Sequence, residues 1–97
     1  MTQIQQIKAD IRRHKHTLRR EYGVRTLGLF GSCVRNQQGP KSDIDILVEF
    51  EAPIGLLRFN RLERKLGEIL GGKVDLVMKS ALKPHIGRRI LEEVVPL

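Results

Sequence analysis

The stretch GLFGSCVRNQQGPKSDIDILVEF, residues 28–50, places two carboxylates inside a pattern that is otherwise typical of a hydrophobic strand. Aspartate is depleted in strands, and a buried charge without a partner is costly, so Asp43 and Asp45 need an explanation. Because side chains alternate across a strand, both carboxylates are expected on one face. The opposite face is apolar and is predicted to join the core through Ile44, Ile46, Val48 and Phe50.

The two carboxylates have a spacing that suits metal ions. The strand rise separates Asp43 and Asp45 by about 6.5 to 7 Å at the backbone, so both can reach one hard cation or two ions about 4 Å apart. Asp75 interrupts a second apolar run, KVDLVM at residues 73–78, and looks similarly buried. Three Asp without nearby Cys or His favour Mg²⁺ or Mn²⁺ over zinc. The alternative is that the Asp-x-Asp is the solvent face of an edge strand, and the third acid counts against it.

A Gly-Ser pair precedes the acids and has the features of a phosphate site. Gly31 and Ser32 follow a predicted strand and open a predicted short helix, 32–36, whose backbone N–H groups would face an anion. Glycine allows a phosphate to approach the backbone closely, and the Ser hydroxyl adds a donor. Arg35, one turn further on, could also reach a phosphate. In the alternative interpretation Ser32 is only a helix cap and Arg35 only a surface charge.

Hydrophobic periodicity and the positions of glycine and proline predict seven elements in one domain, residues 1–97. Helices alternate with strands, which favours an α/β (α+β) fold with a small mixed sheet flanked by helices. The expected order is helix 3–21, strand 24–30, short helix 32–36, strand 42–50, helix 55–70, strand 73–78 and helix 81–94.

The composition limits the classes of molecule that this chain is expected to bind. The net charge of +7 suggests an anionic partner, which could be a nucleotide, a nucleic acid or an acidic protein face. With one Tyr and three Phe, a stacking platform for single-stranded nucleic acid is poorly supported. The single cysteine, Cys33, excludes an internal disulfide and is expected to be a small filler residue. No apolar run is long enough to span a membrane, so a cytoplasmic protein is expected.

A basic segment on the first predicted helix has two interpretations. It is either a solvated helix face or a contact for an acidic partner or RNA. The histidines show no metal-site spacing with cysteine and are expected at the surface, and Tyr22 is expected to pack. The residues of the basic segment are Arg12, Arg13, His14, Lys15, His16, Arg19 and Arg20, and the third histidine is His85.

The combination of a strand, Gly-Ser, ten residues, Asp-x-Asp on a strand and a distal Asp resembles the DNA polymerase β-like nucleotidyltransferase superfamily. The resemblance covers Leu27 to Val77. The short chain and the run SDIDILVEF are similar to the minimal nucleotidyltransferases, which act in prokaryotes as antitoxins paired with HEPN-domain toxins. Asn36 and Val34 depart from the pattern, where many relatives carry Gly and Ala, and could alter the phosphate loop without removing a ligand.

The resemblance implies a mechanism and a set of roles. Gly31 and Ser32 would hold the triphosphate of ATP, Asp43 and Asp45 would bind two Mg²⁺ ions, and Asp75 would complete one metal site and help activate the acceptor. The implied reaction is AMP transfer to a tyrosine of a toxin encoded next to this chain, which silences its RNase activity.

Two other functions stay open at this stage. One is an antitoxin that inhibits its partner only by binding, and the other is a basic nucleic-acid-binding module. The complete set of acids favours catalysis over the first. The missing aromatic platform counts against the second.

Overall fold

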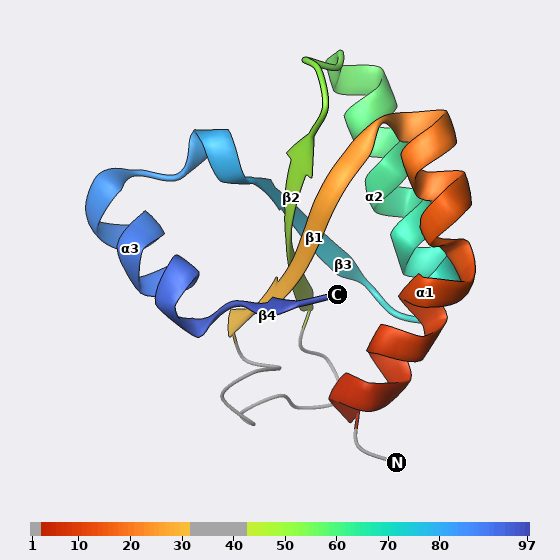
Figure 1. Ribbon diagram of the computed structural model, residues 1–97, viewed down its shortest axis with the longest axis horizontal. Helices are drawn as coiled ribbons and strands as arrows, with labels where there is room; N and C mark the ends of the chain where they lie inside the picture. The colour runs from red at the N-terminus through yellow and green to blue at the C-terminus, as the bar shows by residue number, and fades with distance from the viewer. Residues whose placement is uncertain (1–2, 32–42) are drawn as a thin grey trace.

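The computed structural model describes residues 3–31 and 43–97, and its strands form one mixed four-stranded sheet in the order β3-β2-β1-β4 (Figure 1). β2 pairs with β3 in parallel, whereas β1 runs antiparallel to both β2 and β4. The predicted mixed sheet flanked by helices is therefore confirmed. The elements are α1 (Gln3–Tyr22), β1 (Val24–Phe30), β2 (Ile44–Phe50), α2 (Leu56–Leu70), β3 (Val74–Met78), the 3-10 helix η2 (Lys79–Ala81), α3 (Pro84–Glu93) and β4 (Val95–Pro96).

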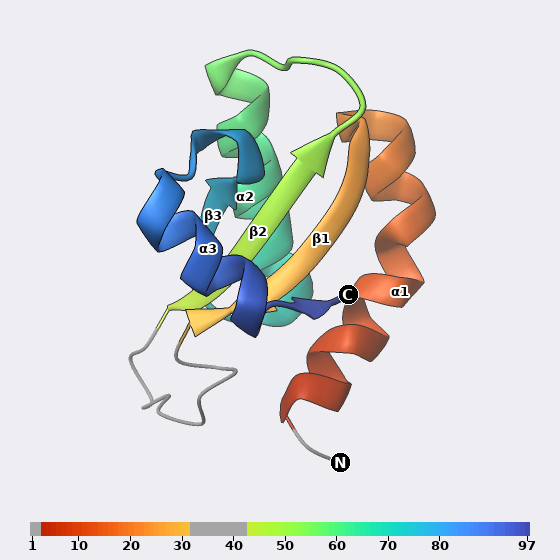
Figure 2. The ribbon, with the colours of Figure 1, turned by 60° about the vertical axis from the view of Figure 1, so that its left-hand side comes forward.

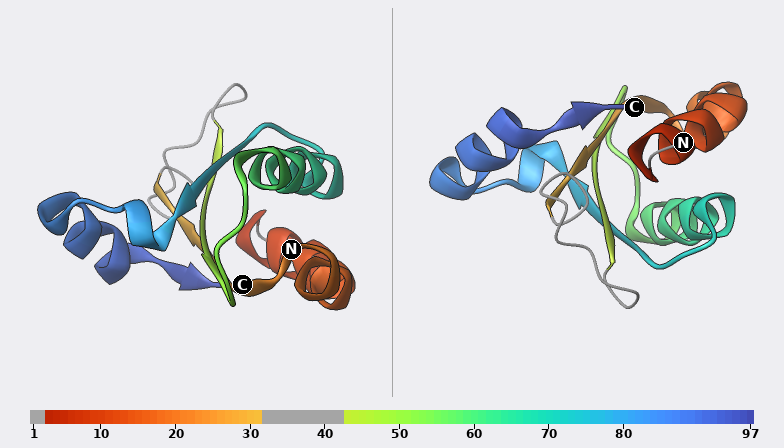
Figure 3. Two further views of the ribbon diagram at one scale, coloured as in Figure 1. Left: turned by 90° about the horizontal axis from the view of Figure 1, so that it is seen from above. Right: turned by 90° about the horizontal axis from the view of Figure 1, so that it is seen from below.

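The helices cover the two faces of the sheet unequally. α1 and α2 pack side by side on one face, and α3 lies on the other (Figure 3). The main core lies between the sheet and the α1–α2 pair, and it includes the predicted apolar face of β2, with Phe50 partly buried at its end. The buried residues of this core are Ile7, Ile11, Leu18, Val24, Leu27, Leu29, Ile44, Ile46, Val48, Leu62, Leu66, Val74 and Leu76.

The α3 face of the sheet depends on a glycine. A Cβ atom at Gly28 would lie 2.4 Å from Cγ2 of Val94, far inside contact distance. Only glycine therefore lets the segment that joins α3 to β4 lie flat against β1. This contact carries the C-terminal end of α3 over the sheet near the start of β2 (Figure 2).

Several element boundaries agree with the sequence prediction. α1 ends as expected, because Gly23 adopts φ 68° and its N–H donates to the carbonyl of Arg19 at 3.0 Å. Tyr22 packs against the core, as predicted. No helix within the described ranges is long and apolar enough to cross a membrane. The predicted short helix 32–36 and most of the loop that follows lie outside the described residues.

The C-terminal region differs from the prediction. The expected helix 81–94 is shorter, because Pro84 can occupy only the first turn of a helix, and it is preceded by η2. Residues 95–96 form the edge strand β4, extended by a bond from the Leu97 N–H to the Leu27 carbonyl at 2.9 Å. A strand of two residues carries too short a pattern to be read from sequence.

The apolar faces of the last two helices are also less buried than their periodicity predicts. Leu62 and Leu66 are fully buried, but Leu56 and Leu57 in the first turn of α2 are 74% and 77% exposed. On α3, Ile86 is 58% exposed and Gly87 is the buried residue. The α3 layer therefore buries fewer large apolar side chains than the α1–α2 layer.

Candidate active site

The strand register places two of the predicted acids next to each other. Asp45 in β2 is paired with Asp75 in β3 and, on its other side, with Phe30 in β1. Directly paired residues share a face, and neighbouring strands lie about 4.8 Å apart. Asp43 immediately precedes β2, two residues before Asp45, and is half-buried like it. Asp45 and its partner Asp75 occupy the α3 side of the sheet, while Ile44 and Ile46 occupy the core side.

Asp75 differs from the prediction. Its neighbours Val74 and Leu76 are buried, as expected, but Asp75 itself is exposed. The reason is that Val74 and Leu76 face the core beneath α1 and α2, whereas Asp75 faces the other side of the sheet on its outermost strand. Within the described residues no three His, Cys, Asp or Glu side chains are arranged as a set of metal ligands. The register thus brings Asp45 and Asp75 together without forming a closed three-carboxylate centre.

Gly31 is positioned against Asp45. It is buried, adopts φ 75°, and a Cβ there would lie 2.2 Å from Oδ2 of Asp45. Two requirements therefore coincide at this residue: a left-handed backbone that favours glycine, and space for a carboxylate. The sequence indicated the glycine as a phosphate contact and missed its second role. Ser32 and Arg35 lie outside the described residues.

The edge strand that carries Asp75 is held by α2. The Leu76 N–H donates to Oε2 of Glu63 at 2.9 Å. The Ile44 N–H donates to the Lys73 carbonyl at 2.8 Å, so the backbone polar groups of residue 73 face β2. Because these groups point to alternate sides along a strand, the N–H of Leu76 faces away from β2, toward the open edge of the sheet. The half-buried Glu63 thus occupies the hydrogen-bonding position of a further strand. The sequence gave no signal for it, because it is one of several charged residues on an amphipathic helix.

A cavity of about 290 Å³ adjoins Asp45 beneath α3. Sequence reasoning missed the α3 side of this cavity, although its side chains recur at helical spacing on one face of α3. Charged residues on that otherwise apolar face were the available signal. The lining residues are Phe30, Gly31, Asp45, Ile86, Arg89, Ile90 and Glu93.

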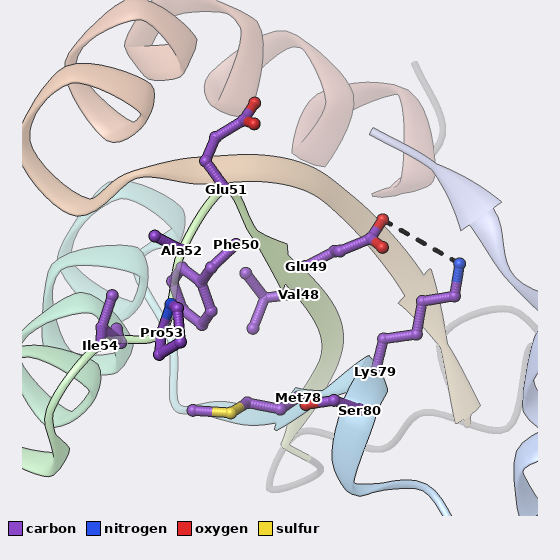
Figure 4. A pocket seen from close by; sticks show the side chains of 10 residues that line it. All are labelled: Val48, Glu49, Phe50, Glu51, Ala52, Pro53, Ile54, Met78, Lys79 and Ser80. Atoms are coloured by element: carbon purple, nitrogen blue, oxygen red, sulfur yellow. Dashed lines mark ion pairs between the residues drawn. The ribbon is translucent and has the colours of Figure 1, made fainter.

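A larger pocket of about 620 Å³ lies at the other end of β2 (Figure 4). Glu49 and Lys79 face each other across it with Oε1 and Nζ 4.0 Å apart, a partly exposed pair that contributes little to stability. Glu49 is four residues from Asp45, or about 13 Å along the strand. The larger pocket also contains two acids, Glu49 and Glu51. We place the candidate active site at Asp45, because there acids from two paired strands, Asp45 and Asp75, lie beside the turn at Gly31.

The basic segment of α1 is mostly exposed: six of its seven residues are exposed and His14 is half-buried. Asp10 accepts hydrogen bonds from Gln6 and from the Arg13 guanidinium. His16 and His85 are exposed, as expected, whereas His14 is half-buried with Nδ1 3.0 Å from the Asp10 carbonyl. Both interpretations of this segment, a solvated face and a partner contact, are compatible with this exposure.

Comparisons with known proteins identify the class. Residues 11–97 match the family described as nucleotidyltransferase domain. Protein adenylyltransferase MntA of Thermococcus cleftensis is 47% identical over 95 residues, which cover 98% of this chain and 96% of the relative. A solved minimal nucleotidyltransferase is 32% identical, with a TM-score of 0.75 and coverage of 94% of this chain and 95% of that one.

Two solved toxin–antitoxin complexes share the fold. One, determined with AMP-PNP, is 24% identical with a TM-score of 0.70 and covers 87% of this chain and 69% of that one. The other contains a tri-AMPylated Shewanella oneidensis HEPN toxin bound to an MNT antitoxin, at 21% identity and a TM-score of 0.67, with coverage of 93% and 70%.

The fold, the paired acids and the glycine turn define a nucleotidyltransferase, and this chain belongs to the nucleotidyltransferase domain family. Within the family it is of the minimal type, and its substrate is a nucleotide.

Proposed function

We propose that this chain is a Mg²⁺-dependent antitoxin that transfers AMP from ATP to a tyrosine hydroxyl of a HEPN-domain toxin. The observation that carries the proposal is the pairing of Asp45 with Asp75 beside Gly31, on one sheet face of a nucleotidyltransferase domain. The named activity of the 47%-identical relative supports the adenylate as the transferred group. The HEPN complex supports the class of partner.

The reaction joins the tyrosine oxygen to the α-phosphorus and breaks the bond from that phosphorus to the oxygen that bridges it to the β-phosphate. Pyrophosphate leaves, and the hydroxyl proton passes to a base. Asp75 is suited to help activate the hydroxyl, because it is exposed and a side chain of another protein can reach it. In this scheme residues 1–97 act as one minimal nucleotidyltransferase domain, and the partner protein brings the acceptor hydroxyl.

Asp43, Asp45 and Asp75 would hold the metal. The donor set consists of carboxylate oxygens without sulfur or nitrogen, which suits Mg²⁺ and also Mn²⁺. When bound, such ions neutralise charge on the phosphates and on the leaving group. Gly31, with Ser32 and Arg35, would hold the triphosphate. In that arrangement the chain's own residues orient the α-phosphate toward Asp75 and the partner's hydroxyl.

The test combines the purified chain, a HEPN-domain partner, ATP and Mg²⁺, and measures the intact mass of the partner. We expect adenylate on the partner with the wild-type chain and at least about a hundredfold slower transfer with Asp45→Asn. Glu49→Gln, which removes a carboxylate further along the same strand, is the matched control and should transfer normally. Replacing the partner's candidate tyrosines with Phe identifies the acceptor, and parallel reactions with GTP, CTP and UTP test the base.

Three results would contradict the proposal. A wild-type chain that adds no mass while still inhibiting the toxin would act by binding alone. Adenylate found on a residue other than tyrosine would exclude that acceptor. Salt-sensitive RNA binding without any transfer would instead favour a nucleic-acid-binding module, to which the exposed α1 segment would contribute.

A further inference from the structure

The cavity beneath α3 joins the candidate active site to a helix that has no assigned role. It is lined by Asp45 of β2, by Gly31 directly after β1, and by a row of α3 residues. Among the lining residues that the structure describes, Arg89 is the one cation, and the acids of the same lining are Asp45 and Glu93.

Arg89 is available for a ligand. Its side chain is exposed at the cavity and forms no ion pair with any residue of the described part of the chain. Ile86 and Ile90 flank it on the same helix face.

The size of the cavity limits what it could bind. Pockets for drug-sized ligands usually measure about 300 to 1,000 Å³, so 290 Å³ suits part of a nucleotide rather than all of it. The part nearest Gly31 would be the phosphates, since this residue begins the proposed phosphate turn. A guanidinium can bind phosphate oxygens with two parallel hydrogen bonds, which a point charge cannot do.

We propose that Arg89 binds the β- and γ-phosphates of the nucleotide and that α3 forms the second wall of the polyphosphate site. This inference rests on the proposed function in one respect, that the substrate is a nucleoside triphosphate. It adds a residue from outside the Gly-Ser turn and the acids. It also explains why Gly28 is needed: the close approach of Val94 sets the distance of α3 from the acids.

The test measures binding rather than transfer. ATP, inorganic pyrophosphate and AMP are titrated, with Mg²⁺ present, into the wild-type chain and into Arg89→Ala, Arg89→Lys and Arg88→Ala. Arg88 is the matched control because it is the adjacent exposed arginine and lines a different pocket, with Lys79 and Lys83. Thermal unfolding of each variant identifies any loss of folding.

Arg89→Ala should weaken the binding of ATP and of pyrophosphate about tenfold, in line with the loss of charge-assisted hydrogen bonds. The binding of AMP should weaken less than about twofold. The affinity of Arg89→Lys for ATP and pyrophosphate should lie between those of Arg89→Ala and the wild type. Arg88→Ala should bind all three ligands like the wild type. The proposal is overturned if Arg89→Ala and Arg88→Ala bind pyrophosphate equally, or if AMP weakens as much as ATP. A folded wild type that binds no ATP overturns both proposals, whereas one that binds ATP but transfers nothing contradicts only the proposed function.

Discussion

The two faces of the sheet are built from the same strands but by different rules. Toward α1 and α2 the side chains are apolar and tightly packed, and Leu29, Ile46 and Leu62 are completely buried. Toward α3 the same strands present acids and Gly28, Gly31 follows directly after β1, and the covering helix leaves Ile86 exposed. The comparison teaches that alternation along a strand lets one segment stabilise the fold and carry the chemistry without compromise between the two.

This division is tested most directly by substituting two neighbouring residues of β2, Ile46 and Asp45. Ile46→Ala should have the larger effect on the free energy of unfolding. Ile46 has no exposed surface, so its truncation should lower the free energy of unfolding by about 2 to 5 kcal/mol. Urea denaturation measures the change. Under conditions where the variant is still folded, the transfer rate per folded molecule should remain near that of the wild type. A tenfold lower rate in the folded fraction would contradict the division.

Asp45→Asn, one residue away, should have the opposite profile. It keeps the side-chain shape and removes the charge, so transfer should fall on the order of a hundredfold to a thousandfold, the range for losing one preorganised electrostatic contact. The free energy of unfolding should change by less than about 1 kcal/mol. Single-turnover transfer and urea denaturation on the same preparation separate the two. If the variant is inactive because it does not fold, Asp45 serves stability rather than the transfer reaction, and the proposed division between the two faces is wrong.

Gly28→Ala tests whether the α3 face depends on close approach. The added methyl would overlap Val94, and overpacking of this kind costs about 1 to 3 kcal/mol or displaces the neighbour. We expect reduced stability together with weaker ATP binding, because α3 moves away from Asp45. Gly55→Ala is the matched control, since a Cβ there meets nothing within 4 Å. If Gly28→Ala loses stability but binds ATP normally, α3 does not contribute to the site.

The two faces of the sheet also differ in how far the sequence predicts them. Ile44 and Ile46 were predicted in the core because burial follows a period of two, which is visible in one segment. The pairing of Asp45 with Asp75 could be anticipated only as a possibility, since register depends on which strands are neighbours. The hydrogen bond of Glu63 could not be predicted, because it depends on where α2 meets the sheet. The place of Arg89 at the cavity had one signal in the sequence, a charge on an otherwise apolar helix face. The exposure of Asp75 follows from the strand order, which the local pattern does not contain.

Glu63 links the two faces and should give the smallest effect. Its carboxylate accepts the Leu76 N–H at the open edge of β3, the strand that presents Asp75 on the other side. Glu63→Ala should cost about 1 to 2 kcal/mol of stability, as expected for a charge-assisted hydrogen bond at a half-buried site that water can partly replace. Glu63→Gln keeps an acceptor oxygen and should lose less. Urea denaturation gives both values, and amide hydrogen exchange at Leu76 reports on the edge directly. If β3 is held only by β2, exchange at Leu76 will be equally fast in all three proteins. If Glu63 fixes the edge, exchange will be faster in Glu63→Ala than in Glu63→Gln, and transfer will decline in the same order because Asp75 is less firmly positioned.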